Sequence, residues 1–512
     1  MAIRTINLPV NRVEGDLEIK VEVEDGAVRD AWSSGTMFRG IERILVGRGA
    51  LDGLVITPRI CGICGTSHLT AAARALESLA GIRPPPNAQR VRNLALMVEH
   101  VQSDMRHAVL TFMADFANPA YRGHPLYEQA VRRYQPFKGE SVLEVLKATR
   151  SVLEINALLA GQWPHSSFIV PGGVVSLPTT ADFVDARTLL TQYRRWYEQR
   201  VLGCSLERFQ AIETEAQLQA WLEESEAHRE GEVGFFVRFA REAGLEKLGR
   251  GFGNFLSCGS LDVPEGSAVA PAAGGQLVPA GFVSGGERVA FSQEPIAEHV
   301  ACSWYEDYEG GRHPFEGETR PYACGNEGRK YSWAKAPRYD GKPAETGPLA
   351  EAMVARVPLF ADLVARGGAN VFVRQLARLT RPARLFAAME TWLSELVADA
   401  SELYRKPEQP MEDSAGYGLV EAARGALGHW VKLREGRIAH YQIVTPTAWN
   451  CSPRDADGVR GAWEEALVGT PVRDPENPVE IGHVVRSFDA CLVCTVHSIS
   501  RGRARGSLRI EL

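Results

Sequence analysis

The sequence predicts an α+β fold with a predominantly helical body, and three observations support this class. Apolar residues recur at helical spacing in many segments, several of them about twenty residues long, as in a long helix bundle. A small N-terminal antiparallel β region, residues 1–35, shows the alternation typical of strands. Residues 250–345 are rich in Gly, Pro and aromatic side chains, which predicts an irregular, partly β excursion that packs on the body. We expect one domain, residues 1–512.

The β region is most distinct at residues 17–24, where apolar and charged residues alternate as Leu-Glu-Ile-Lys-Val-Glu-Val-Glu. A period of two places the apolar side chains on one face of a strand. Asp25-Gly26 follows, a pair that favours a tight hairpin turn. A return strand is therefore expected to begin at Ala27.

The helical body is most distinct at residues 88–117, where apolar side chains recur every three or four positions from Leu94 to Phe112. A shorter helix is expected after Cys64, capped by Thr66 or Ser67. Further helices are expected near residues 142–160, 181–201, 207–227, 234–246, 349–366, 384–404 and 459–468. Loop and strand are expected at residues 436–455 and 479–497.

Composition excludes several classes of function. The chain has 512 residues and a net charge of −6, which gives no reason to expect nucleic acid as a partner. It contains no apolar run of the roughly 18 residues that would span a bilayer. Its first residues lack a secretory signal, so we expect a cytoplasmic protein that associates with membranes only through a partner. Nine cysteines in this length are too few for a disulfide scaffold.

Two Cys-x-x-Cys pairs stand at opposite ends of the chain, each followed by a histidine. The first pair is Cys61 and Cys64 with His68, and the second is Cys491 and Cys494 with His497. Two such pairs can converge into a four-sulfur metal site once the chain folds. Structural zinc is one interpretation, although zinc pairs usually lie some 15–20 residues apart. A redox dithiol is another, and thiolates also suit nickel and iron.

Several further motifs, in order along the chain, give it a resemblance to the large, catalytic subunit of nickel–iron hydrogenases. The resemblance covers essentially the whole length. The motifs are Arg12-Val13-Glu14-Gly15, Gly40-Ile41-Glu42, Arg59-Ile60-Cys61-Gly62-Ile63-Cys64-Gly65-Thr66-Ser67-His68, Gly161-Gln162-Trp163-Pro164-His165, Tyr331-Ser332-Trp333-Ala334-Lys335-Ala336-Pro337-Arg338-Tyr339, Ala423-Arg424-Gly425-Ala426, Trp449-Asn450 and Asp489-Ala490-Cys491-Leu492-Val493-Cys494-Thr495-Val496-His497.

The resemblance implies a role for each cysteine of the two pairs. All four would bind nickel, and Cys64 and Cys494 would also bridge to an iron that carries carbonyl and cyanide ligands. Glu14 would exchange protons with the sulfur of Cys494, a reasonable first step for a carboxyl group beside a metal-bound thiolate. His68 receives no role.

The resemblance also implies roles for residues around the metals. Arg424 would face the open side of the nickel–iron pair, with Asp104 and Asp489 as acidic neighbours. Thr447 would hydrogen-bond a cyanide ligand. The family usually has proline where Ala423 and Ala490 stand, and each alanine loosens the backbone beside the site.

A magnesium site is the third implication. Glu42, His497 and the carbonyl of Ile443 resemble its ligands. Residues 498–512 resemble a tail that is removed after nickel insertion, so a maturation endopeptidase and nickel-insertion factors would be further partners.

The resemblance implies an enzyme that cleaves H2 into protons and electrons. Because the chain has no further cysteine clusters, the electrons would leave through an iron–sulfur small subunit, and higher oligomers are possible. The ending Leu492–His497 is similar to cytosolic uptake and hydrogen-sensing members, and the tail favours uptake. A hydrogen sensor, a structural zinc protein and a relative of the quinone-binding subunit of respiratory complex I are the alternatives.

Overall fold

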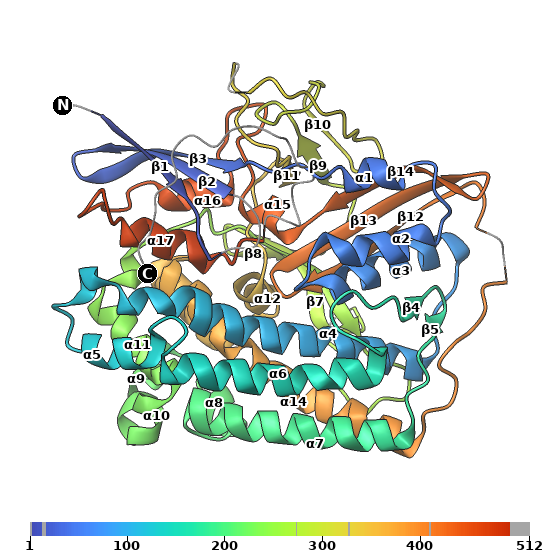
Figure 1. The fold of residues 1–512 in the computed structure, drawn as a ribbon, viewed down its shortest axis with the longest axis horizontal. Coiled ribbons are helices and arrows are strands. Elements are labelled where there is room, and N and C mark those ends of the chain that lie inside the picture. Colours follow the sequence, from blue (N-terminus) through green and yellow to red (C-terminus); the bar gives the residue numbers. More distant parts are fainter. Residues whose placement is uncertain (1–2, 13–16, 273, 326–327, 409–410, 492–512) are drawn as a thin grey trace.

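The computed structural model describes residues 3–12, 17–272, 274–325, 328–408 and 411–491. Long helices form a layer on one side of the molecule, and small antiparallel sheets lie on the other (Figure 1). Buried apolar residues from Leu17 to Cys491 form one continuous cluster between them. The expected mixed fold with a mainly helical body is confirmed.

The helical layer is built from four long helices, with α4 packed against α6 and α14 and α7 packed against α6 and α14. Their bounds are α4 (Pro86–Arg106), α6 (Glu140–Ala160), α7 (Thr180–Trp196) and α14 (Val371–Ala398). After α4, one π-helical and one 3₁₀ turn continue the helical path to Ala117, so the predicted helix at 88–117 is confirmed.

Shorter helices cover the rest of the body. They are α1 (Ile41–Leu45), α2 (Asp52–Ile56), α3 (Gly65–Ala80), α5 (Tyr127–Tyr134), α8 (Leu206–Gln210), α9 (Glu215–Glu224), α10 (Glu226–Glu230), α11 (Glu232–Glu242), α12 (Pro348–Val354), α13 (Pro358–Gly367), α15 (Pro446–Asn450), α16 (Ala462–Leu467) and α17 (Val479–Ser487).

The N-terminal sheet has the order β1-β2-β3, with strands β1 (Arg4–Pro9), β2 (Leu17–Glu24) and β3 (Ala27–Gly35). The apolar residues of β2 are buried and its charged residues face outward, as the alternation predicted. Asp25 and Gly26 both have positive φ, 52° and 78°, the conformation that a two-residue turn between twisted strands requires. The predicted hairpin is confirmed.

A second sheet lies over α3 and has the order β12-β13-β14. Its strands are β12 (Ser414–Ala422), β13 (Gly425–Arg434) and β14 (Arg437–Val444). Glycine is required where β12 crosses the helix, because a Cβ on Gly418 would collide with the carbonyl oxygen of Ala71. Ala423 and Arg424 form the two-residue connection between β12 and β13, so the hairpin presents Arg424 at its tip.

The predicted excursion at 250–345 consists of short strands and loops. Its two sheets have the orders β6-β7-β8 and β10-β9-β11, and a two-stranded β4-β5 ribbon stands apart from them. The strands are β4 (Ile169–Val170), β5 (Gly173–Val174), β6 (Phe255–Asp262), β7 (Gln276–Ser284), β8 (Glu287–Val289), β9 (Ile296–His299), β10 (Gly311–Arg312) and β11 (Ala336–Tyr339).

Several predicted boundaries were wrong. The helix expected at 207–227 is split into α8, α9 and α10, and the helix expected at 349–366 is interrupted before Pro358, which begins α13. The helix expected at 384–404 is α14, which begins at Val371 behind the capping side chain of Asn370.

The segment expected to be loop and strand at 479–497 instead begins with α17. Ile481, Val484, Val485 and Phe488 are buried and have the spacing of one helix face. This helix leads directly into the second cysteine pair.

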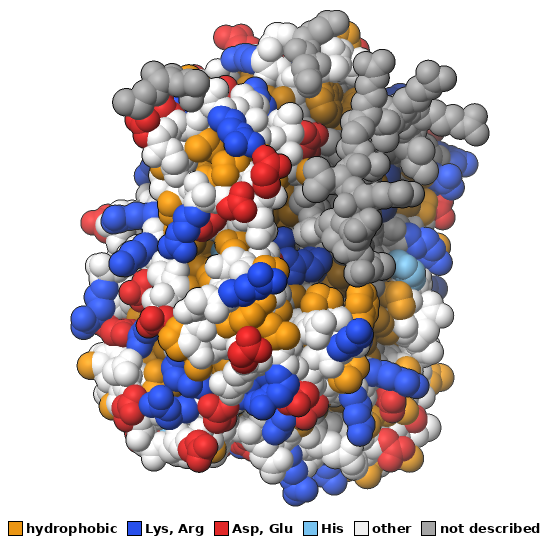
Figure 2. Space-filling view, turned by 60° about the vertical axis from the view of Figure 1, so that its left-hand side comes forward, with side chains coloured by type: hydrophobic (Ala, Val, Ile, Leu, Met, Phe, Trp, Pro, Cys, Tyr) orange, Lys and Arg blue, Asp and Glu red, His pale blue; other side chains and the backbone are white. Residues whose placement is uncertain are grey.

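Charged side chains of both signs are interspersed over one face of the molecule, with apolar surface exposed between them (Figure 2). No helix in the described part of the chain combines the length and the apolar character needed to cross a bilayer.

Candidate metal centre

Three of the four predicted ligands come together in the structure. The sulfur atoms of Cys61, Cys64 and Cys491 all lie within 4.8 Å of one another, and those of Cys61 and Cys491 are 3.4 Å apart. All three thiols are buried and none forms a disulfide. Cys494 lies outside the described residues. A buried set of converging thiols is the ligand type that suits thiophilic metals such as nickel, iron and zinc.

The first cysteine pair is positioned between two helical elements. A 3₁₀ turn (Thr57–Ile60) ends immediately before Cys61, and Cys64 is the N-cap residue of α3. The backbone N–H of Ile63 donates to the sulfur of Cys61 over 3.3 Å. The helix N-terminus and this N–H both favour a thiolate over a thiol.

The predicted capping role of Thr66 or Ser67 is wrong, because Glu99 of α4 caps the helix instead. The carboxylate of Glu99 accepts from the backbone N–H groups of Thr66 at 2.9 Å and Ser67 at 3.1 Å. It also accepts from the hydroxyl of Ser67 over 2.6 Å. Burial raises the pKa of Glu99 to about 7, although these donors lower it. The cap therefore joins α3, and with it Cys64, to the helical layer.

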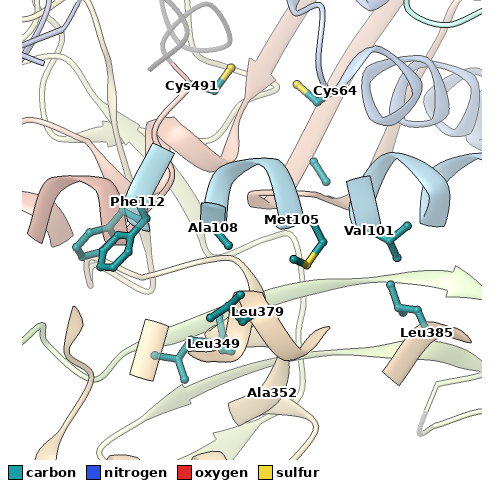
Figure 3. Packing of buried hydrophobic residues seen from close by; sticks show 14 of the residues in the cluster. Cys64, Val101, Met105, Ala108, Phe112, Leu349, Ala352, Leu379, Leu385 and Cys491 are labelled. Carbon is teal, nitrogen blue, oxygen red and sulfur yellow. The ribbon is translucent and has the colours of Figure 1, made fainter. Parts of the chain in front are cut away.

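Cys491 reaches the centre from the segment that follows α17. Figure 3 shows Cys64 and Cys491 on the same side of α4, whose Val101 and Met105 face the core. The backbone N–H of Cys491 donates to the Thr447 hydroxyl oxygen over 2.9 Å. Thr447 thus orients this ligand, and its own hydroxyl hydrogen is left to donate elsewhere. Its predicted contact with a cyanide ligand stays a prediction.

Arg424 points from the β12–β13 hairpin to the three sulfurs. Its Nε donates to Asp489 over 3.0 Å, and its buried Nη1 has no partner among the described residues. Burial alone would lower the pKa of Arg424, but Asp489 and the three cysteines raise it above its usual value. Burial would raise the pKa of Asp489, but Arg424, His107 and Arg378 hold it below the usual range. The two side chains form a fixed ion pair.

Asp104 lies one layer behind this pair. Its carboxylate accepts two hydrogen bonds from Arg381, at 2.7 and 2.8 Å, and it makes no direct contact with Arg424. The same Arg381 donates to the carbonyl of Ala423 over 2.7 Å, so it fixes the backbone directly before Arg424. Burial raises the pKa of Asp104 to about 6, although Arg381 lowers it.

Sequence reasoning missed the arginines of α14 that support the centre. Arg381 binds Asp104, Arg378 donates to the carbonyl of Ser487, and Arg374 binds Glu345. The three recur at i, i+4 and i+7, the spacing of a single helix face. The recurrence of arginines at helical spacing is the sequence signal that could have identified them.

Glu42 and Ile443 of the predicted magnesium site also lie together. The Glu42 carboxylate accepts from the backbone N–H of Ile443 over 2.9 Å and from the hydroxyl of Thr319. Lys335 lies 3.9 Å from Glu42 and 3.6 Å from Glu298, and burial raises the pKa of Glu298 to about 7 although Lys335 lowers it. Such a cluster of buried oxygen atoms fits a hard cation. The contribution of the Ile443 carbonyl stays a prediction.

Glu14 and His497 lie outside the described residues, so their predicted roles stay predictions. Beside the cysteines lies a cavity of about 330 Å³, lined in part by Ile63, His107, Arg424 and Asp489. The centre therefore has a cavity next to its fixed ion pair.

Comparison with known proteins shows a similarity to hydrogenases over almost the whole chain. The family model described as nickel-dependent hydrogenase matches residues 39–118 and 111–497. The periplasmic [NiFeSe] hydrogenase large subunit of Desulfomicrobium baculatum is 32% identical over 96% of this chain and 94% of its own. The hydrogenase-2 large chain of Escherichia coli is 30% identical over 96% of each.

The fold agrees with the sequence match. The structure of the Ni-Fe-Se hydrogenase of D. vulgaris Hildenborough in the reduced state superposes with a TM-score of 0.80 and 31% identity. It covers 97% of this chain and 100% of that one. The described ligands fit the metals that such a family implies, because three buried thiols converge beside a fixed positive charge. The chain belongs to the nickel-dependent hydrogenase family, as a large subunit and an oxidoreductase that acts on H2.

Proposed function

We propose that this chain is the catalytic subunit of a nickel–iron hydrogenase that cleaves H2 heterolytically, in the uptake direction. The observation that carries the proposal is the convergence of three buried cysteine sulfurs within 4.8 Å, next to a buried arginine. When bound, nickel and iron supply the Lewis-acid and redox chemistry that polarises H2. The protein supplies the ligands, the charge and a proton acceptor.

The cysteines have different tasks in this proposal. Cys61 and Cys491 would hold nickel alone, whereas Cys64 and Cys494 would hold both nickel and an iron that carries carbonyl and cyanide ligands. Thr447 would donate a hydrogen bond to one cyanide. Two of the similar proteins named above, those of Desulfomicrobium baculatum and D. vulgaris Hildenborough, carry selenium in their names. This sequence has cysteine at all four ligand positions, so we propose a centre with sulfur alone.

The residues around the sulfurs accept the proton and supply a fixed positive charge. Glu14 accepts the proton that leaves the sulfur of Cys494. Arg424 stays protonated, because Asp489 and the cysteines raise its pKa, so it acts as a fixed charge and donor facing H2 rather than as a base. Asp489 holds its orientation through the 3.0 Å contact, and Asp104 supports the pair through Arg381.

A magnesium ion, held by Glu42, the Ile443 carbonyl and His497, would connect β14 to the C-terminal segment. Glu298 and Gln442 place further oxygen atoms near Lys335. The role of this ion is structural, because it links two segments that both approach the cysteines.

Electrons leave through an iron–sulfur small subunit, since large subunits of hydrogenases pair with a small one. The five cysteines outside the two pairs are spread over the chain, which leaves this subunit no relay of its own. We place the assembly in the cytoplasm, with membrane contact only through partners. A maturation endopeptidase would remove residues 498–512 after nickel insertion.

The test combines metal analysis with turnover. The purified complex is expected to contain one nickel and one iron per large subunit and to reduce a dye with H2. Stoichiometric zinc without nickel would refute the proposal. A metal-loaded complex that responds to H2 through a partner but turns over dye far more slowly than an uptake hydrogenase would indicate a sensor instead.

A further inference from the structure

A buried carboxyl group that has only neutral hydrogen-bond donors among the described residues lies on β12, three residues before Arg424. Oε1 of Glu421 accepts from the backbone N–H of Cys258 over 2.7 Å and lies 3.2 Å from the sulfur of the same residue. Glu421 is fully buried, and its Oε2 has no hydrogen-bond partner in the described part of the chain. The proposed reaction uses neither residue.

The surroundings of Glu421 favour its neutral form. Burial and then the nearby Glu351 of α12 raise the pKa of Glu421 to about 8, although Cys258 of β6 and Arg381 of α14 lower it. His100 of α4 hydrogen-bonds the backbone of Glu421 and is uncharged, because burial lowers its pKa. An ionised Glu421 would also leave Oε2 as a buried anionic oxygen without a donor among the described residues, which costs more than a neutral carboxyl group. Glu421 therefore carries a proton at neutral pH.

Cys258 connects this carboxyl group to a cavity of about 970 Å³. Arg74 of α3 and Asp262 of β6 are charged residues on the cavity wall, and they form an ion pair at 2.8 Å. Tyr417 also lines the cavity and is 39% exposed, so the cavity reaches the molecular surface. The sulfur of Cys258 stays a thiol, because burial and the neighbouring Glu421 raise its pKa well above the usual value. The thiol thus lies between the cavity and Glu421.

The charge of Glu421 affects the backbone that holds Arg424. Arg381 donates from Nη1 to Glu351 and from Nη2 to the carbonyl of Ala423, each over 2.7 Å. An ionised Glu421 would attract the same guanidinium and weaken its hydrogen bond to Ala423, directly before Arg424. A neutral Glu421 leaves Arg381 in place.

We propose that Glu421 is a proton-binding site that exchanges its proton with solvent through the Cys258 thiol, and that its neutral form keeps Arg381 in position behind Arg424. On protonation, the S–H proton crosses the 3.2 Å contact to Oε1, and the sulfur takes a replacement from a hydronium ion in the cavity. Release follows the reverse order, and no atom changes its oxidation state. The proton site rests on the protein alone, whereas its effect on turnover rests on the nickel–iron function proposed above.

Infrared spectra of the purified complex test for the proton independently of the metals. The difference between wild type and Glu421→Gln is expected to contain the C=O stretching band of a neutral carboxylic acid at neutral pH. This band should disappear as the pH rises through about 8. Carboxylate bands in its place at neutral pH would overturn the proposal.

Transfer of the complex to D2O tests the route of exchange. Cys258→Val is expected to slow deuteration of the Glu421 carboxyl group on the order of tenfold, because exchange then requires local opening of the fold. Cys258→Ser keeps a transferable proton and should exchange at close to the wild-type rate. Cys302→Val is the matched control, since Cys302 is a buried thiol that lines a different cavity. The wild-type rate in Cys258→Val would overturn the route.

The wild-type protein covers the case in which Cys258→Val does not fold. The S–H stretching band of Cys258, identified by its loss in Cys258→Ser, is expected to exchange before the Glu421 band or together with it. Exchange of the carboxyl group before the thiol would overturn the route.

The pH profile of H2-dependent dye reduction tests the effect on the centre. Wild-type turnover is expected to fall as the pH rises above about 8, with roughly a tenfold loss one pH unit above the pKa of Glu421. Glu421→Gln cannot ionise, so its rate relative to its own value at neutral pH should not show this fall. Parallel profiles would overturn the positioning of Arg381. Absence of nickel from the wild-type complex would instead refute the proposed function and leave the infrared result standing.

Discussion

Arg424 shows how single residues gain their function from their surroundings. Its sequence context, between two strands with no Gly-Asn or Asn-Gly signal, does not identify a hairpin. The structure places it at the hairpin tip, with Nε on Asp489 and with an Nη1 that has no partner among the described residues. A guanidinium held at one edge leaves its other edge available, which a lysine ammonium cannot reproduce.

Replacing Arg424 by lysine keeps the positive charge and removes the planar guanidinium, so it tests whether the position of the N–H donors matters. We expect Arg424→Lys to lower the rate of H2-dependent dye reduction on the order of 10²-fold, the usual cost of one preorganised donor, with nickel content unchanged. Arg434→Lys is the control, since Arg434 is exposed at the far end of β13, the strand that follows Arg424. Wild-type turnover in Arg424→Lys would show that charge alone suffices.

Glu464 lies away from the cysteines and tests whether burial of a carboxyl group makes the stability of the fold depend on pH. Its carboxylate accepts from the Ser33 backbone at 2.9 Å and from the Tyr331 hydroxyl at 2.7 Å, and burial raises its pKa to about 7. The folded state thus binds this proton more tightly than the unfolded state, so stability falls as pH rises from the usual glutamate pKa through about 7.

The neutral variant Glu464→Gln removes this pH dependence. Its free energy of unfolding should rise relative to wild type by up to about 3 kcal/mol between pH 4.5 and 7.5, the equivalent of the pKa difference. Denaturant titrations at the two pH values measure the change. A constant difference across this range would mean that Glu464 ionises normally in the fold.

At the scale of elements, local patterns predicted the elements with regular periodicity and missed those determined by tertiary contacts. The alternation of apolar and charged residues was sufficient to predict β2, and the helical spacing of apolar residues was sufficient to predict α4. In β13, by contrast, nearly every residue is buried, so no alternation marks the strand. The early start of α14 depends on its cap at Asn370 and on carboxylates from other segments, which pair with its arginines.

The crossing of β12 over α3 is a close contact between two elements that support the site. Gly418→Ala should lower the free energy of unfolding by about 1–3 kcal/mol, because the added methyl forces the strand off the helix that carries Cys64 and His68. Gly123→Ala, an exposed turn position with open space around its Cβ, should stay within about 0.5 kcal/mol of wild type. Equal unfolding midpoints for the two variants would disprove the close packing.

At the scale of the whole molecule, the fold brings Cys61 and Cys491, which are 430 positions apart in the chain, to one centre. The first cysteine pair, the β12–β13 hairpin and the C-terminal segment approach it from different elements, and α4 and α14 support it from below. The cysteines, Arg424 and Asp489 could be predicted from motifs. Glu99, Arg378 and Arg381 could not, because their partners are distant in sequence and only folding pairs them.

Exchange between D2 and water is the measurement that tests the central claim most directly, since heterolytic cleavage releases HD without an external electron acceptor. We predict HD formation by the nickel- and iron-loaded complex, and its loss in Cys491→Ser, with far-ultraviolet circular dichroism confirming that the variant keeps its helices. A complex that contains nickel and iron at the cysteines but forms no HD would contradict the account.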